Sequence, residues 1–126
     1  MRALVVDDSR AMRMILGKIL RSVGFDVIFE AGNGEEALGR LEEHGAMELA
    51  LIDWNMPLLN GYDFVVKVRS QRRYKWMRLM MVTTELETAQ MQRALEAGAD
   101  EYLMKPFMRE AVLEKLQILG LMATES

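Results

Sequence analysis

Five short apolar runs limit the fold of this chain more than any other feature. Each run is followed by a segment whose apolar side chains are spaced as in a helix. The runs lie at residues 3–6, 27–29, 49–52, 79–82 and 102–104. Their apolar residues are consecutive, which is typical of strands that are covered on both faces. Because strands that alternate with helices favour a parallel sheet, we predict one doubly wound α/β domain with five strands and five helices.

The segments after the runs carry helix signals. The first helix is expected to be capped by Ser9 and to end at Gly24. The side chains expected to face the core from the five helices are Met12, Ile15, Leu16, Ile19, Leu20 and Val23; Ala37, Leu38 and Leu41; Phe64, Val65 and Val68; Met91, Ala94 and Leu95; and Val112, Leu116 and Leu119. Residues 32–34 predict a loop before a helix at 35–43, and the basic residues 69–78 predict an exposed connecting loop.

Length and charge exclude several classes of protein. The 126 residues are enough for one core, and we expect residues 1–126 to form a single domain with no output domain. A net charge of −3 argues against nucleic-acid binding. The absence of cysteine excludes disulfides and thiolate metal sites. With neither a signal peptide nor an apolar run of about 20 residues, a cytoplasmic protein without a membrane segment is expected.

Polar side chains follow four of the five runs where the predicted strands end. Asp7 and Asp8 follow the first run, Asp53 ends the third, Thr83 follows the fourth and Lys105 the fifth. The carboxyl ends of parallel strands share one edge, where open α/β sheets bind ligands, so we expect these side chains to converge. Each position alone is more often a solvated turn or helix cap. The prediction of a functional site therefore rests on their joint occurrence.

The chemistry of such a cluster points to phosphoryl transfer. Carboxylates this close repel, and one carboxyl pKa should rise unless a cation is bound. Oxygen ligands without His or Cys suit Mg²⁺. A carboxylate beside Mg²⁺ and a lysine suits attack on phosphorus, which makes Asp53 the candidate nucleophile. The metal and Lys105 would offset charge on the phosphoryl oxygens, and Thr83 would donate a hydrogen bond to one of them.

With these residues in place, the chain resembles the receiver domain of two-component response regulators, in particular the stand-alone chemotaxis regulators of the CheY type. The motifs that carry the resemblance are residues 5–9 (Val-Val-Asp-Asp-Ser), 53–57 (Asp-Trp-Asn-Met-Pro) with Gly61, 81–83 (Met-Val-Thr) and 105–107 (Lys-Pro-Phe). Together they cover essentially the whole chain. The resemblance implies a flavodoxin-like, CheY-like fold and a phosphorylated signalling switch rather than an enzyme.

The resemblance also implies roles for individual residues. Asp53 would accept a phosphoryl group from a phosphohistidine on a sensor histidine kinase. Asp8, Asp53 and the backbone carbonyl of Asn55 would hold Mg²⁺, with Asp7 acting largely through water. Lys105 would pair with Asp53 in the unphosphorylated protein, and the bond between Lys105 and Pro106 would be cis.

A switch follows from the same resemblance. The phosphoryl group would draw the Thr83 hydroxyl toward it, and Tyr102 would rotate into the vacated space. The surface of the fourth helix, fifth strand and fifth helix would then change, and a downstream target would bind it. We expect a monomer, with the flagellar motor switch as one candidate target.

Some residues depart from the family pattern. Thr84 replaces a small residue and should narrow access to the phosphoryl site. By the same resemblance, Glu85 and Asn55 would flank the site at positions that tune hydrolysis of the phosphoryl group. Glu85 and Glu87 give the start of the fourth helix acidic character where a basic residue is more typical, so a partner other than the flagellar motor switch, or a non-motility pathway, is an alternative. Since no output domain is expected, a phosphorelay role is a further alternative.

Three other features have simpler expectations. Trp54 should be a partly exposed loop aromatic that reports on metal binding, and the single histidine, His44, should be solvated. Tyr74 and Trp76 lie among the basic residues of segment 69–78, which we expect to be a solvated loop and not a nucleic-acid patch.

Two rival functions share parts of this pattern. A phosphohydrolase with an aspartate nucleophile needs a second Asp two residues later as general acid, where this chain has Asn55. A flavodoxin-like cofactor binder needs a phosphate loop after the first strand, where Asp7 and Asp8 would repel the phosphate.

Overall fold

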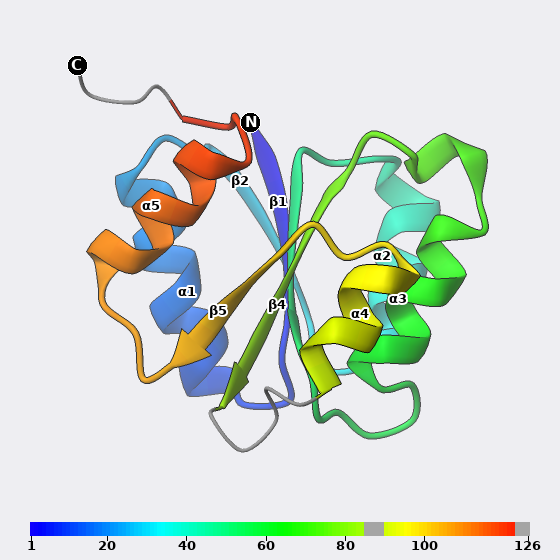
Figure 1. Cartoon of the computed structure of the whole chain (residues 1–126). Coiled ribbons are helices and arrows are strands. Elements are labelled where there is room, and N and C mark those ends of the chain that lie inside the picture. Colours follow the sequence, from blue (N-terminus) through cyan, green and yellow to red (C-terminus); the bar gives the residue numbers. More distant parts are fainter. Residues whose placement is uncertain (85–89, 123–126) are drawn as a thin grey trace.

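The computed structural model describes residues 1–84 and 90–122 and confirms the predicted α/β fold (Figure 1). The strands are β1 (Arg2–Val6), β2 (Val27–Ala31), β3 (Leu49–Asp53), β4 (Arg78–Thr84) and β5 (Glu101–Lys105). The helices are α1 (Arg10–Ser22), α2 (Gly34–His44), α3 (Gly61–Arg69), α4 (Met91–Ala97) and α5 (Arg109–Ile118), with a short 3₁₀ helix η1 at Arg72–Tyr74. The five strands form one parallel sheet in the order β2-β1-β3-β4-β5.

Helices cover both faces of the sheet, with α1 and α5 on one side and α2, α3 and α4 on the other (Figure 1). The core is correspondingly divided into two apolar clusters. Ala50 and Ile52 of β3 belong to the cluster on the α2–α3–α4 side, and Leu49 and Leu51 belong to the cluster on the α1–α5 side. Both faces of β3 are therefore buried, which is why its apolar residues are consecutive in the sequence.

Side-chain caps start three of the helices that follow strands. Ser9, Asn33 and Asn60 accept hydrogen bonds from the backbone N–H groups of residues 12, 36 and 63, respectively. Ser9 lies three residues beyond the end of β1 and Asn33 two residues beyond the end of β2, whereas Asn60 lies seven residues beyond the end of β3. The first two caps therefore start a helix close to the carboxyl edge of the sheet.

Several local predictions need correction. The strands extend one or two residues beyond the apolar runs, and Gly34, predicted in a loop, begins α2. Ile15 and Leu95 were expected in the core but are 49% and 39% exposed. Their helices turn a narrower stripe toward the sheet than the apolar pattern suggests, so residues at the stripe margin remain at the surface.

The basic segment 69–78 is not simply a solvated loop. Tyr74 is fully buried in the core. The Arg69 guanidinium donates hydrogen bonds to the backbone oxygens of Tyr74, Met77 and Gly98 at 3.0, 2.7 and 2.9 Å and pairs with Asp100 at 2.8 Å. These contacts tie the segment to the turn after α4. The side chain of Trp76, in contrast, is 80% exposed.

Two aromatic side chains also differ from expectation. Trp54 is only 7% exposed and belongs to the core cluster, with its ring centroid 6.2 Å from that of Tyr62. The His44 ring, expected in solvent, stacks on Phe29 with centroids 4.2 Å apart. No helix within the described ranges is long and apolar enough to cross a membrane.

Candidate functional site

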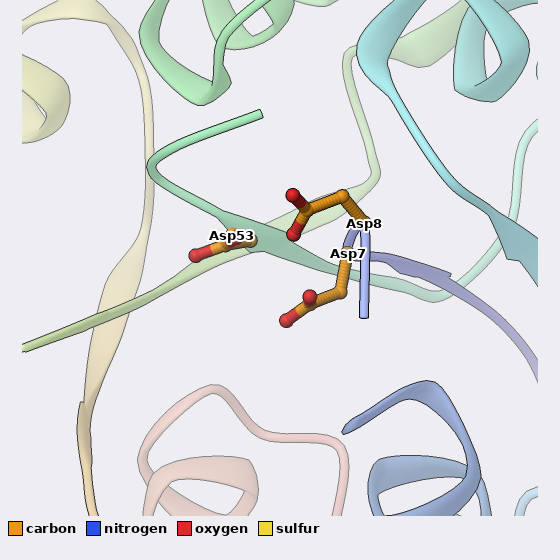
Figure 2. A group of neighbouring side chains, drawn as sticks. All are labelled: Asp7, Asp8 and Asp53. Atoms are coloured by element: carbon orange, nitrogen blue, oxygen red, sulfur yellow. The ribbon is translucent and has the colours of Figure 1, made fainter. Parts of the chain in front are cut away.

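Three carboxylates meet at the carboxyl edge of the sheet. Asp7 and Asp8 leave the end of β1, and Asp53 ends the neighbouring strand β3 (Figure 2). Val6 pairs with Ile52 in the sheet register, so Asp7 and Asp53 occupy equivalent positions on adjacent strands. One oxygen from each of the three carboxylates lies within 4.8 Å of the others. Asp7 and Asp53 are buried, whereas Asp8 is exposed and forms the solvent side of the cluster.

Lys105 brings the one ammonium group that the described structure places against these carboxylates. Its Nζ lies 3.3 Å from Asp53 Oδ1 and 3.6 Å from Asp7 Oδ2. The peptide bond that follows, between Lys105 and Pro106, is cis. Three carboxylates thus face a single lysine, and the cluster keeps an excess of negative charge when all three are ionised.

The electrostatics of the cluster disfavour the ionised state of its two buried members. Burial, and secondly the charge of Asp7, raise the pKa of Asp53 to about 6, although Lys105 lowers it in part. Burial also raises the pKa of Asp7, against the opposing hydrogen bond from the Ser9 N–H and the charge of Lys105. A bound cation would relieve this unfavourable charge.

The donor set fits Mg²⁺. Asp7 Oδ2 is buried and has no hydrogen-bond partner among the described residues, so one oxygen of the cluster can still accept a ligand. All the clustered donors are carboxylate oxygens, which hard divalent cations prefer. Asp7, Asp8 and Asp53 are therefore the residues that would hold the ion. Asn55 lies two residues beyond Asp53 on an exposed loop, and the role of its backbone carbonyl remains a prediction.

Thr83 and Thr84 end β4, the strand between Asp53 and Lys105. Thr83 is completely buried. It follows Val82, the residue that pairs with Asp53 in the sheet. The Thr83 hydroxyl lies 3.4 Å from the Thr84 carbonyl oxygen. Thr84 is half-buried and stands opposite Lys105 in the register. Glu85 and Glu87 lie outside the described residues, so the expectations for them remain predictions.

Tyr102 lies on β5, near the edge of the sheet. It is half-buried and packs against the α2–α3–α4 side of the core. The Lys115 ammonium of α5 sits 4.5 Å from the centre of its ring and 3.0 Å from Glu101 Oε1. The side chain is thus held between core and surface, and its role as a switch remains a prediction.

Sequence reasoning missed one pair of residues beside the acidic cluster. Arg13 Nη1 donates a hydrogen bond of 2.7 Å to the backbone oxygen of Asp7, and Arg13 Nε donates one of 3.0 Å to Glu30 Oε1. Arg13 lies on α1 and Glu30 on β2, and the two residues are 17 apart in the sequence. No local pattern links them, and only the fold brings them together.

The chain is similar over most of its length to several bacterial chemotaxis proteins. The chemotaxis protein CheY1 of Helicobacter pylori is 41% identical over 94% of this chain and 96% of its own. A CheY homolog of Campylobacter jejuni is 42% identical over 95% of this chain and 93% of its own. Among solved structures, the Vibrio cholerae chemotaxis protein CheY4 superimposes with a TM-score of 0.84 and 34% identity, over 93% of this chain and 96% of that one.

The family model for the response regulator receiver domain matches residues 3–117, a range that omits only the first residue of β1 and the last residue of α5 among the strands and helices. Asp7, Asp8, Asp53, Thr83 and Lys105 all lie within the matched range. This chain belongs to the response regulator receiver domain family.

Proposed function

We propose that this receiver domain is a phosphorylation-activated switch in chemotaxis-type signalling. Asp53 accepts a phosphoryl group from a phosphohistidine of a histidine kinase, and the phosphorylated form binds a downstream target protein. The observation that carries the proposal is the cluster of Asp53 with Asp7, Asp8 and the Lys105 ammonium, at 3.3 Å from Asp53, in a chain 41% identical to a CheY protein.

The phosphoryl transfer is a nucleophilic displacement at phosphorus. An Asp53 carboxylate oxygen forms the new O–P bond while the N–P bond of the phosphohistidine breaks, and the electron pair stays on the imidazole nitrogen. With a pKa of about 6, Asp53 is mostly ionised at neutral pH and available as the nucleophile. When bound, Mg²⁺ supplies positive charge that offsets the charge on the phosphoryl oxygens.

Other residues of the chain contact the phosphoryl group on Asp53 or respond to it. Lys105 already contacts Asp53 and can follow the new phosphoryl oxygens with a small movement of its flexible stem. The Thr83 hydroxyl is the proposed donor that responds to the added charge, and Tyr102 is the side chain that reorients. A cavity of about 520 Å³ lined by Tyr102, Phe107 and Lys115 among others lies on the β5–α5 side, where we place the target surface.

Incubation with labelled acetyl phosphate and Mg²⁺ tests this proposal. We expect about one phosphoryl group to be trapped per chain as an acyl phosphate, without sustained turnover of a phosphate ester. Catalytic turnover without a trapped intermediate would instead indicate a hydrolase. A pull-down with beryllofluoride-treated and untreated protein would identify the output. A target retained only by the treated form supports the switch, whereas a histidine phosphotransfer partner would favour the phosphorelay alternative.

Metal binding should be visible in the fluorescence of Trp54, which is buried next to Asp53. Trp76 is 80% exposed and adds a background signal, so the measurement is best made in a Trp76→Phe protein. Adding Mg²⁺ should change the emission, and Asp8→Ala should abolish the change because it removes one of the three clustered carboxylates. Asp63→Ala, on the exposed surface of α3, should retain the response. An unaltered response in Asp8→Ala would exclude Asp8 as a ligand.

The access of a small phosphodonor to Asp53 should depend on the size of the side chain at position 84. Thr84→Ala is expected to accelerate labelling by acetyl phosphate about fivefold, equivalent to about 1 kcal/mol of barrier, because the half-buried Thr84 stands beside Lys105 at the site. Thr84→Val keeps the width and should label at the rate of the wild type. Initial labelling rates at a fixed acetyl phosphate concentration decide the matter, and equal rates for the wild type and the Thr84→Ala variant would contradict the prediction.

A further inference from the structure

We propose that Arg13, anchored by Glu30, is a positioning residue for the metal site at the end of β1. The inference rests on the proposed function only in requiring that the acidic cluster bind Mg²⁺. Arg13 lies one helical turn inside α1, and its side chain is 18% exposed. Its guanidinium bridges Asp7 at the acidic cluster and Glu30 on β2.

The contact with Asp7 fixes a peptide group and not a carboxylate. Arg13 Nη1 donates to the backbone oxygen of Asp7, which belongs to the peptide that joins Asp7 to Asp8. Two further hydrogen bonds hold Asp7, one from its N–H to the Ala31 oxygen at 3.0 Å and one from the Ser9 N–H to its Oδ1 at 2.8 Å. With the Arg13 contact, the peptide plane is held on both sides of Asp7.

The orientation of this peptide plane sets the position of the Asp8 Cα, from which the Asp8 side chain projects. Asp8 is the exposed member of the three carboxylates, so the core does not pack around it as it does around Asp7 and Asp53. The backbone must therefore supply much of the orientation of its carboxylate. Groups that orient metal ligands typically affect metal affinity by 10–100-fold when they are removed.

Glu30 affects both the charge and the orientation of the Arg13 guanidinium. The Glu30 carboxylate, 3.0 Å from Arg13 Nε, offsets the guanidinium charge that would otherwise oppose a cation nearby. It also holds the planar guanidinium in one orientation, with a second N–H directed at the Asp7 oxygen. The hydrogen bonds of Arg13 and its positive charge thus have opposite effects on Mg²⁺ affinity. Losing the bridge between Asp7 and Glu30 weakens Mg²⁺ binding, whereas losing the positive charge of Arg13 strengthens it.

Calorimetric titration of the full chain with Mg²⁺ separates these two effects. We expect Arg13→Met to weaken Mg²⁺ binding about tenfold or more. Arg13→Lys keeps the charge but cannot bridge both partners, so it should also weaken binding. Arg40→Met is the matched control, because Arg40 donates to the Glu30 backbone oxygen at 3.0 Å and has no contact with Asp7. This control should bind Mg²⁺ like the wild type.

Other outcomes would overturn the inference. Wild-type or tighter Mg²⁺ binding in Arg13→Lys, which keeps the positive charge, would show that Arg13 does not position the site. If the wild type labels from acetyl phosphate while the Arg13 variants bind Mg²⁺ normally, this inference fails and the proposed function stands. A wild type that binds no Mg²⁺ would remove the premise of both.

Discussion

Replacing Asp53 by asparagine is expected to reduce phosphoryl labelling from acetyl phosphate to background. The amide oxygen of asparagine carries no full negative charge and is a poor nucleophile toward phosphorus. Asp7 and Asp8 are not expected to replace it, because both leave the end of β1 and the Lys105 ammonium lies nearer to Asp53, at 3.3 Å, than to Asp7, at 3.6 Å. Labelling is measured as hydroxylamine-sensitive, alkali-labile incorporation in the presence of Mg²⁺.

The matched control for this experiment is Asp63→Asn. Asp63 is an exposed carboxylate in the first turn of α3, a few residues beyond the site, and the same substitution there should leave labelling intact. Full labelling of the Asp53→Asn protein would show that another residue is the acceptor, and the proposed function would fail at its first step.

The second large effect concerns stability and follows from the raised pKa of Asp53. Its pKa is about 6 in the folded protein and 3.8 ordinarily, so the folded state binds this proton more tightly than the unfolded state does. The resulting contribution to stability is complete below pH 3.8 and is lost as the pH rises through about 6. At neutral pH, ionisation of Asp53 therefore costs about 3 kcal/mol of unfolding free energy.

Asp53→Asn removes this cost. In urea unfolding with EDTA present, the variant is expected to be more stable than the wild type by about 3 kcal/mol at neutral pH. The two proteins should converge below pH 3.8, where the wild-type carboxyl is protonated. Mg²⁺ should stabilise the wild type at neutral pH more than the variant, because it binds the folded carboxylates. A difference that does not vary with pH would contradict the assignment of the raised pKa.

The sequence predicts the sheet and the location of the acidic cluster because both depend on local patterns. Consecutive apolar residues at 49–52 predict a strand buried on both faces, and β3 is completely buried. Once the strands are parallel, Asp7 and Asp53 must lie at the same edge. Their meeting also requires that β1 and β3 be neighbours in the sheet, as they are in the order β2-β1-β3-β4-β5.

Features that depend on distant partners were not predicted. Tyr74 is buried in a segment that Arg69 joins to the turn after α4, because Arg69 donates hydrogen bonds to the backbone oxygens of both Tyr74 and Gly98. The stacking of His44 on Phe29 depends on how α2 lies over β2. The bridge from Arg13 to Asp7 and Glu30 is of the same kind. Charged side chains can bind many partners, and their local sequence does not specify which one the fold will bring near.

Successive side chains of β3 point alternately into the two halves of the interior. The strand that carries the proposed phosphate acceptor is therefore shared by both helical layers. A small shift of this central strand cannot be absorbed on one side alone, because tightly packed side chains on both sides would have to adjust. Chemical events at its tip can consequently influence opposite surfaces of the molecule at once, which would allow separate partners to respond to the same modification.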